Sequence, residues 1–459
     1  QKTAYEIYQC DWSSDVCSSD LTSLPTLDRN PYALVVTSGN VSTSDPSGRG
    51  AGVAINGQRA ASTDILLDGA ENAATFTQTV SQTVPQDSVS EFRILTSNFS
   101  AEYGRASGGV VNVATRSGSN KFEGSVFEQN RNSRLSSNGY DNNARGNPRP
   151  FFNRNQFGGT VSGPIVKNKW FFLDSIEFTR VRSSATVTRW VPTTAYIASA
   201  SAATQSFFTA YGSLAATPNG VVSTDGRFRQ VTYIAPTDAG GGTPQNTWNN
   251  VARVDWQKSS RTSMFFSYKA SRETDLPGTI ANSPWSGYTA GAQQFNQNFQ
   301  ASGTHNFSSN AVFDGKLTYR RARGKVTLGA KSPNTPTLYW FDQALPTLNN
   351  LCIAMPGYLP CSPGSGLPAP ELEQLWDVKP NMTWLHGSHN VRFGGQYVHL
   401  NDDTIFGAYQ NASEGLSGSN YSQAAANFVS GTLVRFQVAV DPQGKFPGSF
   451  VNLPVKAPN

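Results

Sequence analysis

The stretch that decides the fold is Phe313-Asp314-Gly315-Lys316-Leu317-Thr318-Tyr319-Arg320, in which apolar or small residues alternate strictly with polar ones. Successive side chains of a β-strand point to opposite faces, so this segment predicts a strand with one apolar and one charged face. Residues 376–384 and 391–397 repeat the pattern. One face of such strands fits lipid or a protein core, and the other fits water.

Composition favours β-structure over helix. Charged residues make up only 15% of the 459 residues, whereas aromatic residues reach 11%. No window of about 18 consecutive apolar residues occurs, which excludes a transmembrane helix but allows a transmembrane β-barrel, whose lipid face uses every second residue. The net charge of +5 is spread along the chain, so nucleic-acid binding has little support.

Turns and loops alternate in length along the chain. Short polar turns at 167–169, 258–261 and 386–389 separate alternating segments and predict hairpins. Tight turns at one rim and long loops at the other are typical of an outer-membrane barrel. A soluble sandwich core also alternates, so a secreted β-sandwich binding protein remains an alternative. The long polar stretches, rich in Gly, Pro, Ser, Thr and Asn, are residues 193–245, 273–292, 324–374 and 401–425.

The cysteine and histidine residues suggest structure rather than chemistry. Cys352 and Cys361 lie in a Pro- and Gly-rich stretch, which suits a small disulfide-closed loop in an oxidising compartment. Two unpaired loop thiols are the alternative. His386 and His389 flank a tight turn, where solvation is favoured over a metal site. No nucleophile elbow, Walker loop, HExxH or dinucleotide fingerprint occurs, so we predict no metal, no cofactor and no enzymatic activity.

The chain divides into segments of different character. Residues 5–21 resemble translated sequencing-adapter segments found in some metagenomic assemblies and lack the regions of a signal peptide, so we interpret residues 1–21 as non-native. Cys10 and Cys17 are therefore left out of fold reasoning. Residues 22–120 hold short β-like pieces joined by Gly- and Ser-rich turns and predict a small α/β unit. Residues 121–459 hold longer strands and long polar loops.

An ordered series of segments runs from Leu24 through the strand region at residues 387–395. In the first unit the segments are Leu24-Pro25, Arg29-Asn30-Pro31, Asn56-Gly57-Gln58-Arg59, Ile65-Leu66-Leu67-Asp68-Gly69, Glu91-Phe92-Arg93-Ile94-Leu95, Asn98-Phe99-Ser100-Ala101-Glu102-Tyr103-Gly104-Arg105 and residues 108–113. Later segments are residues 116–125, 154–165 and 169–172. Taken in order, this series resembles the TonB-dependent receptor superfamily, specifically its Oar-like, acidobacterial type.

The resemblance implies a mainly β protein, with a plug domain over residues 22–120 and a partial transmembrane antiparallel β-barrel with long extracellular loops over residues 121–459. It implies an outer-membrane location in contact with lipid, and uptake of an unknown ligand, such as a carbohydrate or a peptide, energised by the TonB complex. It also implies that plug residues face or pair with the barrel, although ordinary surface roles are the alternative for each. These residues are Arg59, Asp68, Gly69, Glu91, Arg93, Glu102, Tyr103, Gly104 and Arg105.

The resemblance also implies parts that this sequence does not display. A complete receptor of the type carries a signal peptide, a soluble N-terminal domain, a TonB-contacting segment and about 22 barrel strands. Alternating segments number roughly ten here. We therefore expect the chain to be a fragment of a receptor. A barrel acting in adhesion or secretion without active transport is the alternative function.

Overall fold

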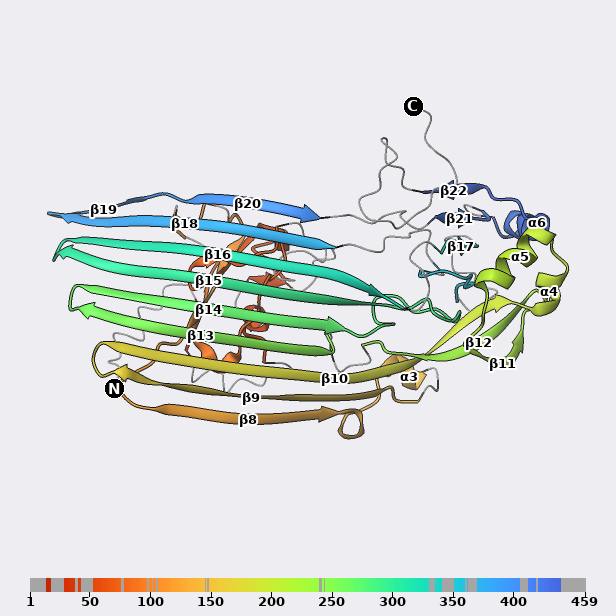
Figure 1. Ribbon diagram of the computed structural model, residues 1–459, viewed down its shortest axis with the longest axis horizontal. Helices are drawn as coiled ribbons and strands as arrows, with labels where there is room; N and C mark the ends of the chain where they lie inside the picture. Colours follow the sequence, from red (N-terminus) through yellow and green to blue (C-terminus); the bar gives the residue numbers. More distant parts are fainter. Residues whose placement is uncertain are drawn as a thin grey trace, which may run out of the picture.

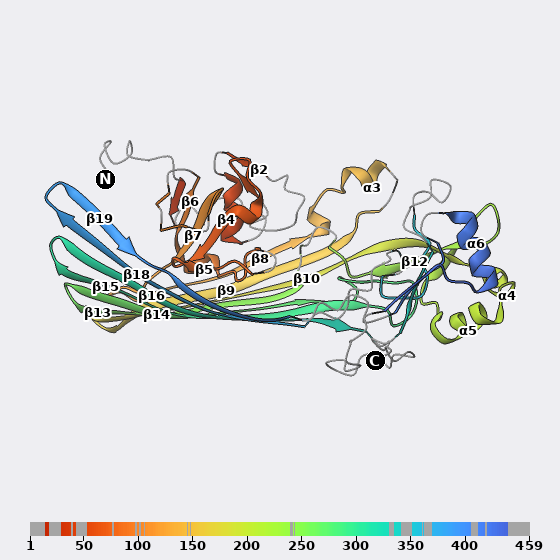
Figure 2. The ribbon, with the colours of Figure 1, turned by 90° about the horizontal axis from the view of Figure 1, so that it is seen from above.

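Three parts make up the molecule, which is seen here as a computed structural model (Figures 1 and 2). They are a small N-terminal unit, a broad curved sheet that we call the wall, and a compact cluster at one end of the wall that we call the cap. The structure describes residues 14–17, 29–37, 40–42, 53–75, 78–96, 99–100, 102–104, 106–144, 146, 148–238, 242, 244–329, 335–340, 351–359, 361, 370–404, 412–417 and 420–438.

The N-terminal unit is built on a five-stranded sheet in the order β1-β6-β7-β4-β5. β4 and β7 pair in parallel, and the other neighbours pair antiparallel. Apolar side chains, among them Ile65, Phe92 and Val111, form a buried core. The elements are β1 (Ser14–Cys17), η1 (Pro31–Thr37), β2 (Val41–Ser42), β3 (Ala54–Ile55), η2 (Ala60–Ser62), β4 (Thr63–Leu67), β5 (Ala70–Glu71), η3 (Gln86–Ser88), β6 (Val89–Leu95) and β7 (Gly109–Thr115).

The segment that we set aside as non-native contributes an edge strand. Ser14 to Cys17 pair antiparallel with residues 91–94 of β6. An edge strand offers a row of unpaired backbone groups, which a segment of any sequence can pair with. The pairing therefore shows only that β1 extends the sheet of the N-terminal unit. It does not test whether residues 1–21 are native. Cys10 lies outside the described residues.

The wall is a 12-stranded sheet whose neighbours are all antiparallel. β19 and β20 both pair with β18, at successive positions along it. The strands are β8 (Glu123–Asn132), β9 (Phe151–Val166), β10 (Trp170–Pro192), β11 (Thr217–Val222), β12 (Phe228–Ala235), β13 (Asn246–Ser259), β14 (Thr262–Asp275), β15 (Ala290–Ser308), β16 (Ala311–Leu328), β18 (Glu371–His386), β19 (His389–Gly394) and β20 (Tyr397–Thr404).

The wall curves around the N-terminal unit, which lies on its concave face (Figure 2). A β-sandwich would instead pack two sheets face to face, so the secreted-sandwich alternative is wrong. The predicted hairpins are confirmed at all three short turns, where β9 meets β10, β13 meets β14, and β18 meets β19. Among the described residues, no helix has the length and apolar character needed to cross a membrane.

The two faces predicted for residues 313–320 are confirmed. Thr318 and Arg320 face the N-terminal unit and are almost fully buried beneath it, each about 1% exposed. Leu317, on the opposite face, stays 45% exposed. The polar face of the wall is thus its inner face, and the apolar face points outward.

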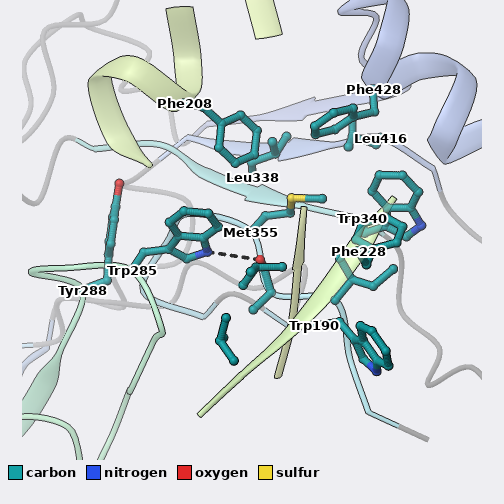
Figure 3. Close-up of a cluster of buried hydrophobic side chains, with 14 of the residues drawn as sticks. Trp190, Phe208, Phe228, Trp285, Tyr288, Leu338, Trp340, Met355, Leu416 and Phe428 are labelled. Carbon is teal, nitrogen blue, oxygen red and sulfur yellow. Dashed lines mark hydrogen bonds between the residues drawn. The ribbon is translucent and has the colours of Figure 1, made fainter. Parts of the chain in front are cut away.

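Much of the described part of the long stretches predicted as polar loops instead folds into the cap. Their aromatic residues bury one another, because rings from several stretches pack edge to face or stacked, as Phe228 does on Trp340 at 5.0 Å (Figure 3). This core could not be predicted from composition, because its apolar residues are dispersed among many polar ones. Besides β11 and β12, the cap contains α4 (Thr194–Ala198), α5 (Ala202–Tyr211), β17 (Thr337–Tyr339), β21 (Ser413–Gly415), α6 (Tyr421–Ser430) and β22 (Arg435–Gln437). Between β8 and β9 lie η4 (Ser133–Leu135) and α3 (Tyr140–Ala144).

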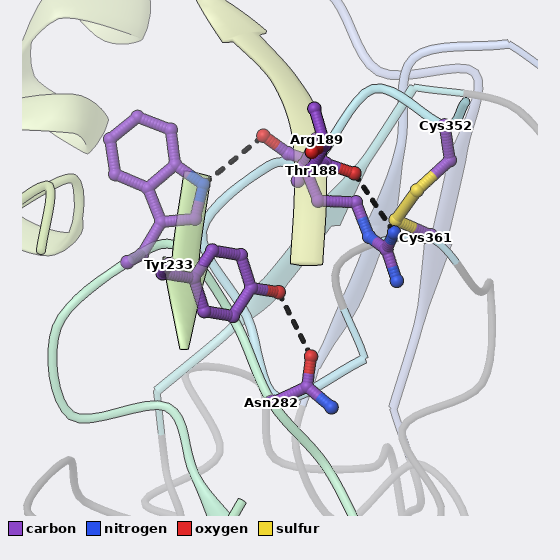
Figure 4. Close-up of a disulfide and its surroundings, with 8 residues drawn as sticks. Thr188, Arg189, Tyr233, Asn282, Cys352 and Cys361 are labelled. Carbon is purple, nitrogen blue, oxygen red and sulfur yellow. Dashed lines mark hydrogen bonds between the residues drawn. A yellow bond between two sulfur atoms is a disulfide. The ribbon is translucent and has the colours of Figure 1, made fainter. Parts of the chain in front are cut away.

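A disulfide joins Cys352 and Cys361 within the cap (Figure 4). The loop that it closes is tied to its neighbours by backbone and side-chain hydrogen bonds. Ala354 donates its backbone N–H to the carbonyl of Trp190 at 2.7 Å, and the indole N–H of Trp285 donates to the carbonyl of Ala354 at 3.1 Å. The loop therefore connects segments that are distant in sequence.

Candidate functional site: the interface between the N-terminal unit and the wall

A two-residue turn carries the N-terminal unit to the wall. Asp68 and Gly69 join β4 to β5, and both have positive φ, +52° and +74°. Such a tight hairpin needs positive φ at both central residues, and Asp-Gly is a favoured pair for it. The Asp68 carboxylate therefore lies at the tip of a tight turn. In the structure this turn faces the wall.

Asp68 is the most fully engaged acid of the interface. Its carboxylate accepts hydrogen bonds from the backbone N–H of Thr115 at 2.7 Å and from the Thr115 hydroxyl at 2.9 and 3.0 Å. The wall supplies two cations: Lys269 Nζ lies 2.9 Å from Oδ2 and Arg253 Nη1 lies 3.9 Å from Oδ1. With its side chain only 3% exposed, the acid depends on these partners to remain charged.

The balance of these effects sets the acidity of Asp68. Burial by itself would raise the pKa of the carboxyl. The positive charges of Lys269 and Arg253, together with the hydrogen bonds from Thr115 and Lys269, outweigh burial and hold the pKa of Asp68 below its usual value. The carboxylate is therefore ionised throughout the neutral range.

The wall holds the two cations in place. Lys269, on β14, is fully buried and donates to the Ser267 hydroxyl at 2.8 Å and to Gln300 Oε1 at 3.0 Å. Gln300 in turn donates from Nε2 to the backbone carbonyl of Asp68 at 3.0 Å. Register explains the grouping, because Ser267 and Gln300 are directly paired across β14 and β15.

A second contact lies on β16 and β18. Arg320, about 1% exposed, forms an ion pair with Glu373 and donates to the backbone carbonyl of Ala73 at 2.7 Å. Glu373 also accepts from the backbone N–H of Thr75 at 2.8 Å. Both wall side chains therefore hold backbone groups of the segment that follows β5.

A third contact lies at the other side of the N-terminal unit. Arg29 forms ion pairs with Asp87 of its own unit and with Glu177 of β10, the latter at 3.2 Å. Gln156 of β9 donates to the other oxygen of Glu177 at 2.6 Å. The guanidinium carbon of Arg29 also lies 3.8 Å from the centre of the Phe127 ring.

A cavity of about 620 Å³ separates the N-terminal unit from β16, β18 and β19. Gly69, Glu102, Tyr103 and Gly104 line it from the N-terminal unit, and Lys316, Lys379 and Arg392 are among the wall residues that line it. Burial and the nearby charge of Glu102 raise the pKa of Tyr103. Among the described residues, no group of three or more His, Cys, Asp or Glu side chains could hold a metal ion.

Comparison with known proteins agrees with this geometry. The family model described as "Outer membrane beta barrel domain" matches residues 114–447, and that described as "TonB-dependent Receptor Plug Domain" matches residues 18–111. The chain belongs to the TonB-dependent receptors. It is an outer-membrane protein, and its family is one of transporters, not enzymes.

One curated relative and several solved structures resemble this receptor chain. The TonB-dependent transporter Oar of Myxococcus xanthus is 35% identical over 145 residues, which are 30% of this chain and 13% of that protein. The outer-membrane transporter YddB of Escherichia coli has a TM-score of 0.55 at 14% identity, covering 88% of this chain and 50% of that one. A variant of the ferric enterobactin receptor of Pseudomonas aeruginosa has a TM-score of 0.52 at 14% identity, covering 87% and 50%. The chain thus spans half the length of these solved receptors.

The receptor brings only some of the nominated residues to the wall. Asp68 forms the central ion pairs, and Gly69, Glu102, Tyr103 and Gly104 line the cavity beside them. Arg59 is exposed. Glu91 and Arg93 lie on β6, where they pair with β1 at the edge of the sheet. Arg105 lies outside the described residues.

Sequence reasoning missed the partners on the wall and one on the N-terminal unit. Lys269, Arg253 and Glu373 are inward-facing residues of strands, and Arg29 forms its own contact with the wall. A signal for the wall residues was available, because charged residues on the polar face of a barrel strand must meet water or a polar partner. Which of them meet the N-terminal unit follows from strand register, which the sequence did not disclose.

Proposed function

We propose that this chain is part of a receptor that takes up a ligand across the outer membrane by moving its N-terminal unit relative to the wall. The observation that carries the proposal is the polar interface. The unit is held by ion pairs and hydrogen bonds centred on Asp68, Arg320 and Arg29, and Leu173 and Val251 of the wall also join its apolar core. Polar contacts of this kind can be exchanged for water when the unit moves.

The energy for this movement is proposed to come from the TonB complex of the inner membrane. Family membership supports this partner, because the matched family is named for its dependence on it. From the sequence, we assigned no residues of this chain to the TonB-contacting segment of a complete receptor. The ion pairs of Asp68 with Lys269 and Arg253 are proposed to break during transport.

The ligand is proposed to be a carbohydrate or peptide oligomer. Asn and Gln residues in the long loop stretches support this class, because their side-chain amides can form hydrogen bonds. Stacking by the cap tryptophans does not support it, because Trp190, Trp285 and Trp340 are each about 2–3% exposed and pack within the cap core. Ferric siderophores and cobalamin are the alternatives. One solved relative is named a ferric enterobactin receptor and another a siderophore receptor, but at 14–15% identity they support only the fold.

We also propose the boundaries of the parts. The plug domain would occupy residues 22–120 and the partial barrel residues 121–459, supported by the end of β7 at Thr115 and the start of β8 at Glu123. Residues 1–21 are proposed to be non-native. Independent sequencing of the gene tests this, since a genuine segment would reappear in reads from a separate library.

A reversible tether tests the transport proposal. The Thr83 hydroxyl lies 3.2 Å from Asn249 Oδ1, across the interface between the N-terminal unit and β13. We expect the double variant Thr83→Cys with Asn249→Cys, in the complete receptor in outer membranes, to lose proton-gradient-dependent uptake when oxidised and to regain it on reduction. The panel of labelled ligands would contain oligosaccharides, oligopeptides, a ferric siderophore and cobalamin.

Matched controls separate tethering from damage. Each single cysteine variant should transport normally, and reduction of the unmodified receptor reports any effect of opening the Cys352–Cys361 bond. Uptake that continues in the oxidised double variant, with the cross-link verified by mass spectrometry, would contradict the proposal. Ligand binding without uptake under any condition would favour the adhesion or secretion alternative.

A further inference from the structure

The outward face of the wall carries a group of cations at its long-loop end. Register places Arg323 of β16 in one row with Phe295 and Arg272, and Lys325 in the next row towards the cap. Directly paired residues share a face, and Arg323 lies an even number of residues from the outward-facing Leu317, so all of these side chains point away from the N-terminal unit. We call this group the basic belt; its members are Arg180, Arg272, Arg321, Arg323 and Lys325.

The basic belt has no carboxylate partner, in contrast to the charges of the inner face. None of its members forms an ion pair with an acid of the described residues. Arg180 donates only to the backbone carbonyls of Thr179 and Thr247, each at 2.9 Å. In the row of Arg272 and Arg323, the described carboxylates belong to the strands at the two edges of the wall, β8 and β20.

The position of the belt along the strands is that of a membrane interface. On β16, Phe313 near the short turn and Arg323 are ten residues apart by number, and 9–11 residues of a tilted strand cross the apolar part of a bilayer, about 30 Å. Next to the belt, on the side of the short turns, a row of outward-facing aromatic residues runs continuously across four strands. Its members are Tyr268, Phe299, Tyr319 and Trp376, with adjacent ring centres 4.6, 6.3 and 4.6 Å apart.

We propose that the basic belt binds phosphate-bearing headgroups of lipids in the outer leaflet. Unpaired cations on one surface repel one another, so a stable arrangement calls for an anionic partner at the same depth. Guanidinium groups match phosphate oxygens with two parallel hydrogen bonds. Arg272 and Arg323 lie two strands apart, roughly 10 Å, so one headgroup can contact both.

Charge removal at this rim tests the proposal. The complete receptor, purified from outer membranes in mild detergent, would be titrated with phosphorylated lipopolysaccharide and followed by native mass spectrometry. At about 1 kcal/mol for each basic residue near a charged membrane surface, we expect the variant Arg272→Gln, Arg323→Gln, Lys325→Gln to bind roughly 100-fold more weakly. The same lipid stripped of its phosphates should bind the native receptor as weakly as phosphorylated lipid binds the variant.

A second triple variant controls for total charge. Lys167→Gln, Lys258→Gln, Arg261→Gln removes three cations from the short-turn rim and should leave lipopolysaccharide binding unchanged. Heat-modifiable migration verifies that each variant is folded, and Arg272→Lys with Arg323→Lys supplies a milder change if the first variant fails to fold, with an intermediate loss expected. Equal binding by the native receptor and the folded glutamine variant, or equal binding of phosphorylated and stripped lipid, would overturn the proposal.

Discussion

Lys269 Nζ lies 2.9 Å from Asp68 Oδ2, and neither side chain is more than 3% exposed. The pair joins a turn of the N-terminal unit to the inner face of a wall strand. Because both charges are out of water, removal of the Asp68 carboxylate leaves the Lys269 ammonium buried without its counter-charge. This relationship makes Asp68 the residue at which the interface is most sensitive to substitution.

Asp68→Asn should therefore destabilise the attachment of the N-terminal unit by about 3–5 kcal/mol, the usual result of breaking one side of a buried ion pair. Asn tolerates positive φ, so the backbone of the turn is preserved. Hydrogen exchange of the unit, compared with that of the wall, measures the loss. A double-mutant cycle with Lys269→Met checks the cause: the second change should restore part of the stability, and strictly additive losses would contradict direct coupling.

Acidification should weaken the same contact only in strong acid. The pKa of Asp68 in the folded receptor lies below its usual value, so its contribution is fully present above the unfolded-state pKa, about 3.9, and is lost as the pH falls through the lower folded value. Exchange of the Thr115 amide, which donates to Asp68, reports the contact once corrected for intrinsic rates. Protection should be constant from pH 7 to about pH 4; a loss near pH 6 would point to another group.

Gly69→Ala should destabilise the turn by about 1–2 kcal/mol, because φ is +74° and a side chain there is strained. The new methyl group would also lie 2.9 Å from Lys316 Nζ, so the lysine must move. Gly57→Ala is a matched control, with φ +71° and no atom within 4 Å of the new methyl group. Denaturant unfolding should give similar losses for both variants, while only Gly69→Ala changes cross-linking of the N-terminal unit to β16. Identical cross-linking would mean that Gly69 matters for the turn alone.

Replacement of both Cys352 and Cys361 by Ser should loosen the cap and spare the interface with the N-terminal unit. Closure of a loop of this length contributes roughly 2–3 kcal/mol through the entropy of the unfolded chain. Limited proteolysis should reveal new cleavage between residues 351 and 361, whereas cleavage in residues 53–117 should not change. Phe428→Ala serves as a comparison, because it removes a ring whose centre lies 4.5 Å from that of Tyr196 and leaves the disulfide intact. It should lower the stability of the same core by about 3–5 kcal/mol.

The sequence by itself determined the clearest alternating strands of the wall, their two faces and three of the short turns between them. Alternation at residues 313–320 assigned Thr318 and Arg320 to the polar face, because side-chain direction in a strand depends on local backbone geometry alone. Asp68-Gly69 belongs to the few residue pairs that accept positive φ twice, but we predicted no turn there. The proposed division near residue 120 rests on a change in the length of the predicted strands.

Only the tertiary structure decided which charges meet and where the loop aromatics go. Lys269 reaches Asp68 because strand register and wall curvature place it under one particular turn, and neither is encoded in a local pattern. Trp285 and Trp340 become buried because separate loops pack together, which composition cannot indicate. Long-range contacts of this kind depend on the positions of whole strands, and a periodic sequence fixes the orientation of a side chain without fixing its partner.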